Sequence, residues 1–321
     1  MEDILDCCCG LDIHKESIVA CLLAGPVKSE RKPHREVKEF STQMKDLLAL
    51  RQWLVEYQCH YVAMESTGIY WQPVYAVLEA SLTDEMHLLV VNARHMKNVP
   101  GKKTDMKDAE WIATLLRAGL LKGSFIPEGD IRDLRQFTRY RKALIRDITS
   151  QKNRIEKLLR SNGFRLSSFL SDSFGSSGLA VMHQLVQEGF LTREGLEMSL
   201  KSKARQKANE ILSDLNGILS VPQRKLLHMQ LVHLADLQSN LRQVEEEIHD
   251  NFSQFQGPID LLDSIPGIDQ TAAYIILAEI GRDMSAFPTA QHICSWAGLA
   301  PGNHKSANKQ KNSALRRAII T

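Results

Sequence analysis

Residues 7–25, with the sequence CCCGLDIHKESIVACLLAG, set the fold of the first part of the chain. Their apolar residues form two short blocks, CCCGLDI and SIVACLLAG, which are separated by the polar residues HKE. Short apolar blocks bounded by polar residues are typical of β-strands. We therefore expect two strands here, with Asp12 inside the first of them.

The residues that follow alternate between strand and helix patterns. A third strand is predicted at REVKEFS, and apolar residues at helical spacing predict a helix over 44–57. A strand at YVAMEST, a helix over about 69–82, a strand at MHLLVVN and a helix from Asp105 to about Gly119 come next. Three strands followed by alternating helix and strand predict an α/β domain with a mixed sheet flanked by helices. This order is compatible with an RNase H-like domain.

From residue 131 onward the pattern changes to long helices. Apolar residues occupy six of eight heptad a and d positions over 134–158, and seven of nine over 227–255. Each stretch is long enough for a coiled-coil seam. The two could pair with each other as an antiparallel hairpin, or pair between subunits, and the sequence leaves both open. The Ser- and Gly-rich residues 166–205 between them indicate a loose, variable connecting region.

A third, all-α unit is predicted after residue 256. LLDSIPGIDQTAAYIILAEIG indicates two helices joined by a Pro-Gly turn. The free N–H groups at the start of the second helix would bind phosphate readily, as in a helix-hairpin-helix contact with a DNA backbone. A plain helical turn fits the same residues. The predicted domains are therefore 1–130, 131–256 and 257–321.

The composition and charge of the chain indicate which classes of protein it fits. Apolar residues make up 43% and charged residues 24%, which is typical of a globular protein. The chain has no long apolar run and no secretory signal at its start, so we expect a cytoplasmic protein that does not contact a membrane. The six cysteines match neither a zinc site nor a disulfide framework. The net charge is only +2, but basic blocks over 97–107 and 132–165 suit a polyanionic partner.

Four carboxylates lie at the ends of three predicted elements. Asp12 lies in the first strand, and Glu65 lies at the carboxyl end of another. Asp105 and Asp108 are three residues apart at the start of a helix, which places them on one face, although acids there also favour the helix dipole. Oxygen ligands of this kind suit Mg²⁺ or Mn²⁺. Two such ions could clamp a scissile phosphate, so the acids indicate phosphoryl transfer on nucleic acid.

These residues carry a resemblance to a known family. GLDIHK, MESTGIYWQPVY and VPGKKTDMKDAEWIATLLRAGLL resemble the three blocks of a DEDD transposase domain. PGIDQTAAYIILAEIG and FPTAQHICSWAGLAPGNHKSA resemble the C-terminal transposase domain of the same family. The chain is thus similar, over roughly 6–160 and 258–321, to the insertion-sequence one-ten family of transposases, which includes bridge-RNA-guided recombinases.

The resemblance implies a transposase or site-specific recombinase with a RuvC-type (RNase H-like) domain, coiled-coil helices and a small helical C-terminal transposase domain. It implies that the four acids bind Mg²⁺ or Mn²⁺, and that Ser306 attacks the DNA phosphate to give a phosphoserine intermediate. DNA, a noncoding bridge RNA and further copies of the chain, in a homodimer or homotetramer, are the implied partners. Five lysines near these groups are expected to contact nucleic acid: Lys102, Lys103, Lys107, Lys305 and Lys309.

The serine segment departs from the family pattern. Lys305 and Asn308 stand where the family usually has an acid and a glycine, and the following basic link is shorter. On composition alone, a serine in GNHKSANKQKN is a solvated loop or capping residue, and Ser295 and Ser313 lie nearby. Two alternatives to a serine recombinase therefore stay open. One is a RuvC-type Holliday-junction nuclease that uses the acids and water, and the other is a nucleic-acid-binding remnant without catalysis.

Overall fold

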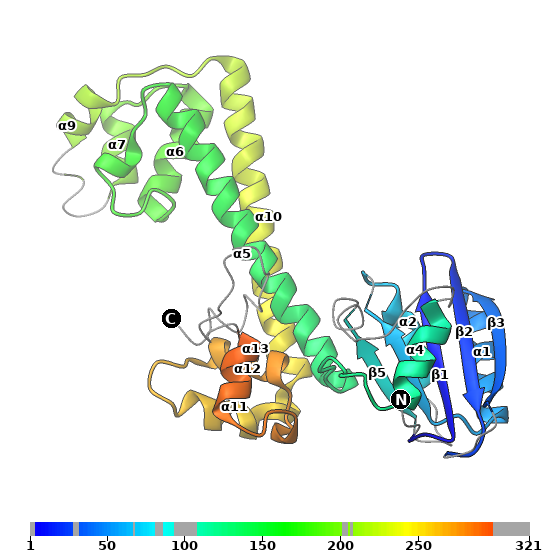
Figure 1. Ribbon diagram of the computed structural model, residues 1–321. Helices are drawn as coiled ribbons and strands as arrows, with labels where there is room; N and C mark the ends of the chain where they lie inside the picture. Colours follow the sequence, from blue (N-terminus) through cyan, green and yellow to red (C-terminus); the bar gives the residue numbers. More distant parts are fainter. Residues whose placement is uncertain are drawn as a thin grey trace, which may run out of the picture. The chain divides into compact units, whose positions relative to one another are not determined.

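The computed structural model describes residues 4–27, 32–66, 68–80, 86–92, 108–200, 205 and 208–297. The chain divides into two compact units, Met1–Ile126 and Pro127–Thr321, which are described separately (Figure 1). The described residues of the first unit combine strands and helices, whereas those of the second unit form helices. The chain thus joins an α/β unit to a helical one, as the sequence predicted.

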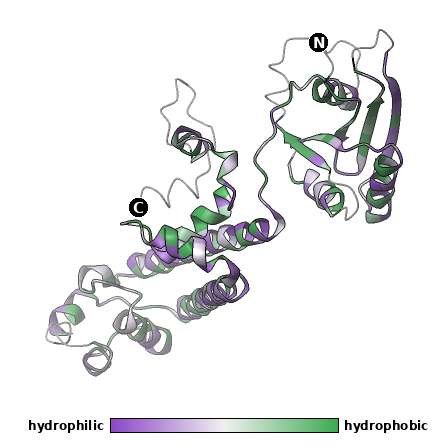
Figure 2. Ribbon diagram, turned by 90° about the horizontal axis from the view of Figure 1, so that it is seen from below, coloured by the Kyte–Doolittle hydropathy of each residue, from purple (hydrophilic) through white to green (hydrophobic). Residues whose placement is uncertain are grey.

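A mixed five-stranded sheet forms the centre of the first unit, in the order β3-β2-β1-β4-β5. The strands are β1 (Cys7–Ile13), β2 (Ser17–Ala24), β3 (His34–Ser41), β4 (Tyr61–Glu65) and β5 (His87–Val91). β2 is antiparallel to both β1 and β3, while β4 is parallel to both β1 and β5. The edge strand β3 is mostly polar and exposed (Figure 2). The expectation of a mixed sheet is confirmed.

Helices cover both faces of this sheet. They are α1 (Met44–Glu56), α2 (Trp71–Glu79) and α4 (Asp108–Arg117). Side chains alternate between the faces of a strand. Accordingly, Cys9 and Leu11 of β1 belong to the core that includes buried residues of α1 and α2, while Cys8 belongs to the core beneath α4. β1 is therefore buried on both faces, which explains its nearly continuous apolar sequence.

Two long helices run side by side in the second unit (Figure 1). They are α5 (Gly129–Ser161) and α10 (Val221–Asn251). Arg141 of α5 contacts Glu245 of α10, while Gln151, further along α5, contacts Gln230, earlier in α10. The helices are therefore antiparallel. Of the two arrangements that the sequence left open, the structure contains the hairpin within one chain; coiled-coil packing stays a prediction.

The prediction of a loose connecting region over 166–205 was wrong. The described part of this segment, with the residues just after it, contains a 3₁₀ helix at Leu166–Ser168 and the α-helices α6 (Ser176–Glu188), α7 (Arg193–Ser199) and α9 (Ala208–Asp214). Val181, Leu185 and Leu196 are buried in one core with Ile155 and Leu227 of the long helices. The Ser- and Gly-rich composition concealed these helices because their apolar residues are buried by distant parts of the chain.

Within the described residues after α10, the chain forms three α-helices. They are α11 (Gln256–Asp263), α12 (Gln270–Ile280) and α13 (Ala290–Ala297), with 3₁₀ turns at Ser253–Phe255 and Met284–Ala286. The turn before α12 contains Gly267 at φ +91°, and Asp269 caps α12 by accepting a hydrogen bond from the backbone N–H of Ala272 at 2.7 Å. Two helices joined by a Pro-Gly turn were predicted here; the phosphate contact stays a prediction. Among the helices described, none combines the length and apolarity needed to cross a membrane.

Candidate active site

Asp12 and Glu65 lie near the carboxyl ends of two neighbouring parallel strands. β1 and β4 pair in register as far as Leu11 with Met64, so the two acids follow as neighbours at the same edge of the sheet. Ala63, two residues before Glu65, is buried in the core beneath α4. Because side chains two residues apart share a face, Glu65 lies on the face that α4 covers. The parallel register brings Asp12 to the same edge.

Helix α4 packs against β1 and runs antiparallel to it. Its last residue, Arg117, accepts a hydrogen bond at its carbonyl from the N–H of Ile4, ahead of β1, at 2.9 Å. Its first turn contacts Gly10, where an added Cβ would lie only 2.3 Å from the carbonyl oxygen of Ala109. Only glycine allows this close approach of the two backbones. The N-terminal end of α4 therefore lies at the sheet edge where β1 ends.

Asp108 is the first residue of α4, and so it joins Asp12 and Glu65 at this edge. The structure thus places three of the four predicted metal-binding acids at the same edge of the sheet, although their side chains do not converge on one point, while Asp105 lies outside the described residues. Within the described part of the chain, no three His, Cys, Asp or Glu side chains are close enough to hold a metal ion. Carboxylate oxygens are the ligands that Mg²⁺ and Mn²⁺ prefer, so the donor set fits a divalent ion.

Asp12 has a partner that the sequence analysis did not single out. Its side chain is 17% exposed, and its Oδ2 lies 3.3 Å from Nε2 of His14. His14 directly follows β1, two residues after Asp12. This spacing in GLDIHK was the signal that could have identified His14. The imidazole orients the carboxylate and, when protonated, would compete with a metal ion for it.

Glu110, in the first turn of α4, contrasts with Asp108. Its carboxylate forms an ion pair with Arg35 of β3. It also lies near the thiol of Cys21, whose pKa is raised to about 11, mainly by burial and further by the Glu110 charge. The Arg35 guanidinium already neutralises Glu110. We therefore exclude Glu110 from the candidate metal ligands, although it stands two residues after one of them.

Ser306, the predicted nucleophile, lies outside the described residues. So do the lysines that the sequence analysis expected to contact nucleic acid. The residues concerned are Lys102, Lys103, Lys107, Lys305, Ser306 and Lys309. Their roles stay predictions, and the site geometry above concerns the acids alone.

Two family models match this chain. A DEDD-type model of the IS110 group, described as "Transposase", matches residues 9–162. A model described as "Transposase IS116/IS110/IS902 family" matches residues 259–320. A curated relative, the "Insertion element IS110 uncharacterized 43.6 kDa protein" of Streptomyces coelicolor, is 27% identical over an alignment of 247 positions, and the match covers 69% of this chain. The chain spans 60% of the length of that relative.

Two solved structures of RuvC from Thermus thermophilus are also similar to part of the chain. One is 14% identical with a TM-score of 0.27, and the match covers 37% of this chain and 99% of RuvC. The other, RuvC in complex with a Holliday junction substrate, is 16% identical with a TM-score of 0.26, covering 37% of this chain and 100% of RuvC. TM-scores this low support no conclusion about this chain.

Proposed function

Since this chain belongs to the IS110 family of transposases, we propose that it cuts and rejoins DNA by metal-assisted phosphoryl transfer. The two family matches cover the segments on which the sequence analysis based its resemblance, in the same order. The observation that supports the proposal is the position of Asp12, Glu65 and Asp108 at the adjoining ends of β1, β4 and α4. We propose in addition that the first unit is RNase H-like, of the RuvC type.

The acids would supply the metal site. Asp12, Glu65 and Asp108, together with Asp105, would hold Mg²⁺ or Mn²⁺. When bound, such ions activate an attacking oxygen and stabilise the leaving one. Two of these acids extend from strands of a rigid sheet, and the third is fixed by the close packing of α4 on Gly10. Ligands held by rigid elements need little rearrangement when the ion binds.

Ser306 would be the nucleophile. Its Oγ would form a bond to phosphorus while the bond from phosphorus to one DNA oxygen breaks and a DNA hydroxyl leaves. The phosphoserine link conserves the ester, so a second DNA hydroxyl can displace the serine and rejoin the strand. A serine hydroxyl is a weak nucleophile until a base or a metal ion takes up its proton. The metal site and Ser306 would therefore have to meet, within one chain or across a homodimer or homotetramer.

The same proposal covers the partners. The lysines of 97–107 and of the C-terminal residues would contact DNA phosphates, which position the nucleic acid without reading its sequence. A noncoding bridge RNA would select the sites to be joined. The reaction would take place in the cytoplasm.

A recombination assay tests the proposal. The full chain is incubated with paired DNA sites, Mg²⁺ and the noncoding RNA of its element, and both recombinant junctions and covalent protein–DNA adducts are measured. We expect both products from the wild type and from the control Ser313→Ala, and neither from Ser306→Ala. Each serine is replaced by the same residue, so the comparison isolates the position of the nucleophile.

The two alternatives give other outcomes. A RuvC-type Holliday-junction nuclease that uses water would still cut after Ser306→Ala and would form no adduct. A nucleic-acid-binding remnant would bind DNA equally well with and without Asp12 and Glu65, and would not cut it. Either result would contradict the serine mechanism.

A further inference from the structure

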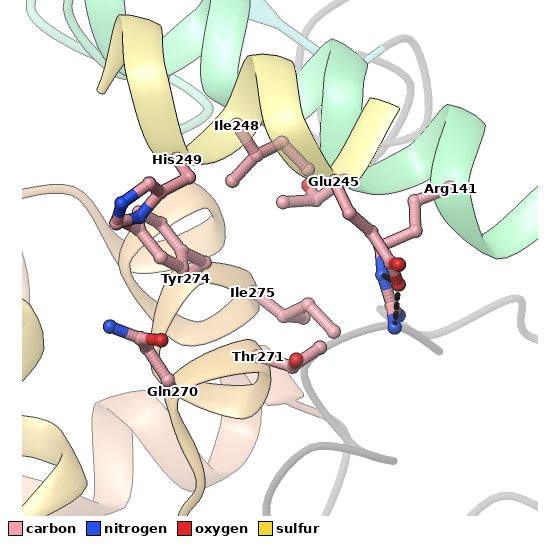
Figure 3. A pocket seen from close by; sticks show the side chains of 9 residues that line it. Arg141, Glu245, Ile248, His249, Gln270, Thr271, Tyr274 and Ile275 are labelled. Carbon is pink, nitrogen blue, oxygen red and sulfur yellow. Dashed lines mark hydrogen bonds and ion pairs between the residues drawn. The ribbon is translucent and has the colours of Figure 1, made fainter. Parts of the chain in front are cut away.

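The two units differ in the reactive side chains that they offer to a small molecule. In the second unit a pocket lies between α5, α10 and α12, but its Arg141 and Glu245 side chains are already paired with each other (Figure 3). The first unit contains five of the six cysteines of the chain. Four of them are buried: Cys8, Cys9, Cys21 and Cys59. Cys7, at the start of β1, is only partly buried, so it is the most accessible of the five.

The thiol of Cys7 lies against the turn that precedes β4. Its Sγ donates to the carbonyl oxygen of Tyr57 at 3.7 Å, and Cys59 follows two residues later in the chain. Both cysteines pack into the core that includes buried residues of α1 and α2. Their side chains form a hydrogen bond with each other. The two sulfur atoms are therefore neighbours, although they come from separate segments of the chain.

The backbone of the sheet brings the two cysteines close enough for a disulfide. β1 and β4 pair in parallel, with Cys9 opposite Val62, so counting back two residues on each segment places Cys7 beside His60, the neighbour of Cys59. Adjacent strands lie about 4.8 Å apart. A disulfide usually joins Cα atoms that are about 4.4–6.8 Å apart. The pair can therefore be bridged with little movement of the backbone.

The two thiols differ in how readily they lose a proton. The hydrogen bond with Cys59 lowers the pKa of Cys7 against the opposing effect of burial, and the charge of Arg117 lowers it further. The same hydrogen bond, together with burial, raises the pKa of Cys59. The thiolate, and not the thiol, is the form of cysteine that attacks an electrophile. Cys7 is therefore the more reactive residue of the pair, and Cys59 is placed to react with its product.

We propose that Cys7 and Cys59 are a redox modification site, at which a peroxide produces a reversible disulfide. The Cys7 thiolate attacks one peroxide oxygen and the O–O bond breaks, which leaves a sulfenic acid on Cys7 while the other oxygen takes up a proton and departs. The Cys59 sulfur then attacks the Cys7 sulfur. The S–O bond breaks, and the hydroxide leaves as water with the proton of Cys59. Two thiols are thus oxidised by two electrons in total, and one peroxide is reduced.

The disulfide would join the start of β1 to the turn before β4. These are the two strands that end near Asp12 and Glu65, so oxidation fixes the pair of strands on which these acids lie. A disulfide stabilises a fold mainly by restricting the unfolded chain, and the loop closed here is about fifty residues long. The oxidised first unit should therefore unfold at a higher temperature than the reduced one.

Oxidation of the full chain by hydrogen peroxide tests this inference. Remaining thiols are alkylated, the chain is digested without reductant, and linked peptides are identified by tandem mass spectrometry. We expect the peptide of Cys7 to be joined to that of Cys59 with the loss of two hydrogens, and dithiothreitol to separate them. The link should be absent from Cys7→Ser and from Cys59→Ser. The matched control is Cys294→Ser, which removes an exposed thiol of the second unit and should form the link like the wild type.

Thermal unfolding followed by circular dichroism gives a second measurement and verifies that each variant is folded. Oxidation should raise the melting temperature of the first unit by about 5 °C or more in the wild type and in Cys294→Ser. It should not raise it in Cys7→Ser or Cys59→Ser. Cys7 is only partly buried, so its serine variant loses little packing and keeps the comparison valid even where Cys59→Ser is less stable.

Three results would overturn the inference. The first is the absence of the linked peptide from the oxidised wild type. The second is a link to Cys59 that persists in Cys7→Ser, which would assign it to Cys8 or Cys9. The third is a disulfide between two copies of the chain, visible as a dimer on a non-reducing gel. The oxidation experiment uses neither metal nor DNA, so its outcome is independent of the recombination assay.

Discussion

Each of the two units contains a carboxylate with little exposure to solvent, and the partners of the two carboxylates differ. Glu279 on α12 is fully buried, and it accepts hydrogen bonds of 3.0 and 3.1 Å from Arg139 and lies 3.5 Å from Arg135. Asp12 on β1 is 17% exposed, and among the described residues its charged contact is His14. A buried carboxylate is costly unless a cation or hydrogen-bond donors meet it. The helical unit supplies its own cations, whereas the sheet unit leaves Asp12 accessible to an external one.

This difference distinguishes Glu279, a carboxylate that stabilises the fold, from Asp12, a carboxylate that is available to a ligand. Burial lowers the pKa of Arg135 to about 10, against the opposing effect of the Glu279 charge, so the guanidinium stays protonated at neutral pH. Arg135 also donates to the backbone carbonyls of Ala278 and Glu279, which fastens α5 to α12. A similar set of contacts at Asp12 would exclude a metal ion. Among the described residues Asp12 has few partners, which leaves its carboxylate available to a metal ion.

The largest effect on stability is expected from removing Glu279, the carboxylate that is paired with arginines. Glu279→Ala would leave Arg135 and Arg139 without their carboxylate, and it should lower the free energy of unfolding by about 3–5 kcal/mol. The control Glu245→Ala breaks the Arg141 pair, in which the glutamate side chain is 43% exposed, and should cost at most about 1 kcal/mol. Urea denaturation followed by circular dichroism measures both. Equal losses would mean that the burial of Glu279 does not matter.

An intermediate effect is expected at the contact that positions Asp108. In Gly10→Ala the added methyl group would meet backbone atoms of Ala109 and Ala113 at 2.3 and 2.4 Å. The helix must move, so the first unit should lose about 1–3 kcal/mol of stability. In the control Gly257→Ala, within α11, nothing lies within 4 Å of the new methyl group, and the change should stabilise by up to about 1 kcal/mol. Thermal unfolding of both variants measures these changes in stability. A Gly10→Ala variant as stable as the wild type would contradict the close packing of α4 on β1.

The smallest effect on stability is expected from neutralising the acid of the site. Asp12→Asn keeps the shape of the side chain and, among the described residues, loses the charged contact with His14, whose side chain is 62% exposed. The free energy of unfolding should therefore change by no more than about 1 kcal/mol. Denaturation in a metal-free buffer measures it. A loss as large as that of Glu279→Ala would make Asp12 a structural acid and erase the contrast between the two units.

Local sequence patterns were sufficient to predict most elements of the first unit. The apolar alternation and the helical spacing identified β1 to β5, α1, α2 and α4, because each pattern reflects which face of that element is buried. The positions of Asp12, Glu65 and Asp108 at element ends were also predicted, while their role as metal ligands stays a prediction. What the sequence could not give was the contact of Gly10 with α4, since it joins residues almost a hundred positions apart.

The second unit was harder to predict for the same reason. Heptads identified α5 and α10, but they do not say whether a helix pairs within its chain or with another copy. Helices α6 and α7 were missed because Val181 and Leu196 are buried by residues of α5, α9 and α10 that are distant in sequence. The buried role of Glu279 was invisible too, since nothing in the sequence shows that Arg135 and Arg139 converge on it.

Titration of Mn²⁺ into the metal-free full chain, followed by electron paramagnetic resonance, tests the central claim most directly. The variants are Asp12→Asn, Glu65→Gln and Asp108→Asn, and the control is Glu39→Gln, an exposed acid on β3. Our account predicts that the wild type and the control bind Mn²⁺ with the same affinity, and that each of the three variants binds it at least about tenfold more weakly. Wild-type affinity in all three variants would contradict the assignment of these acids to a metal site.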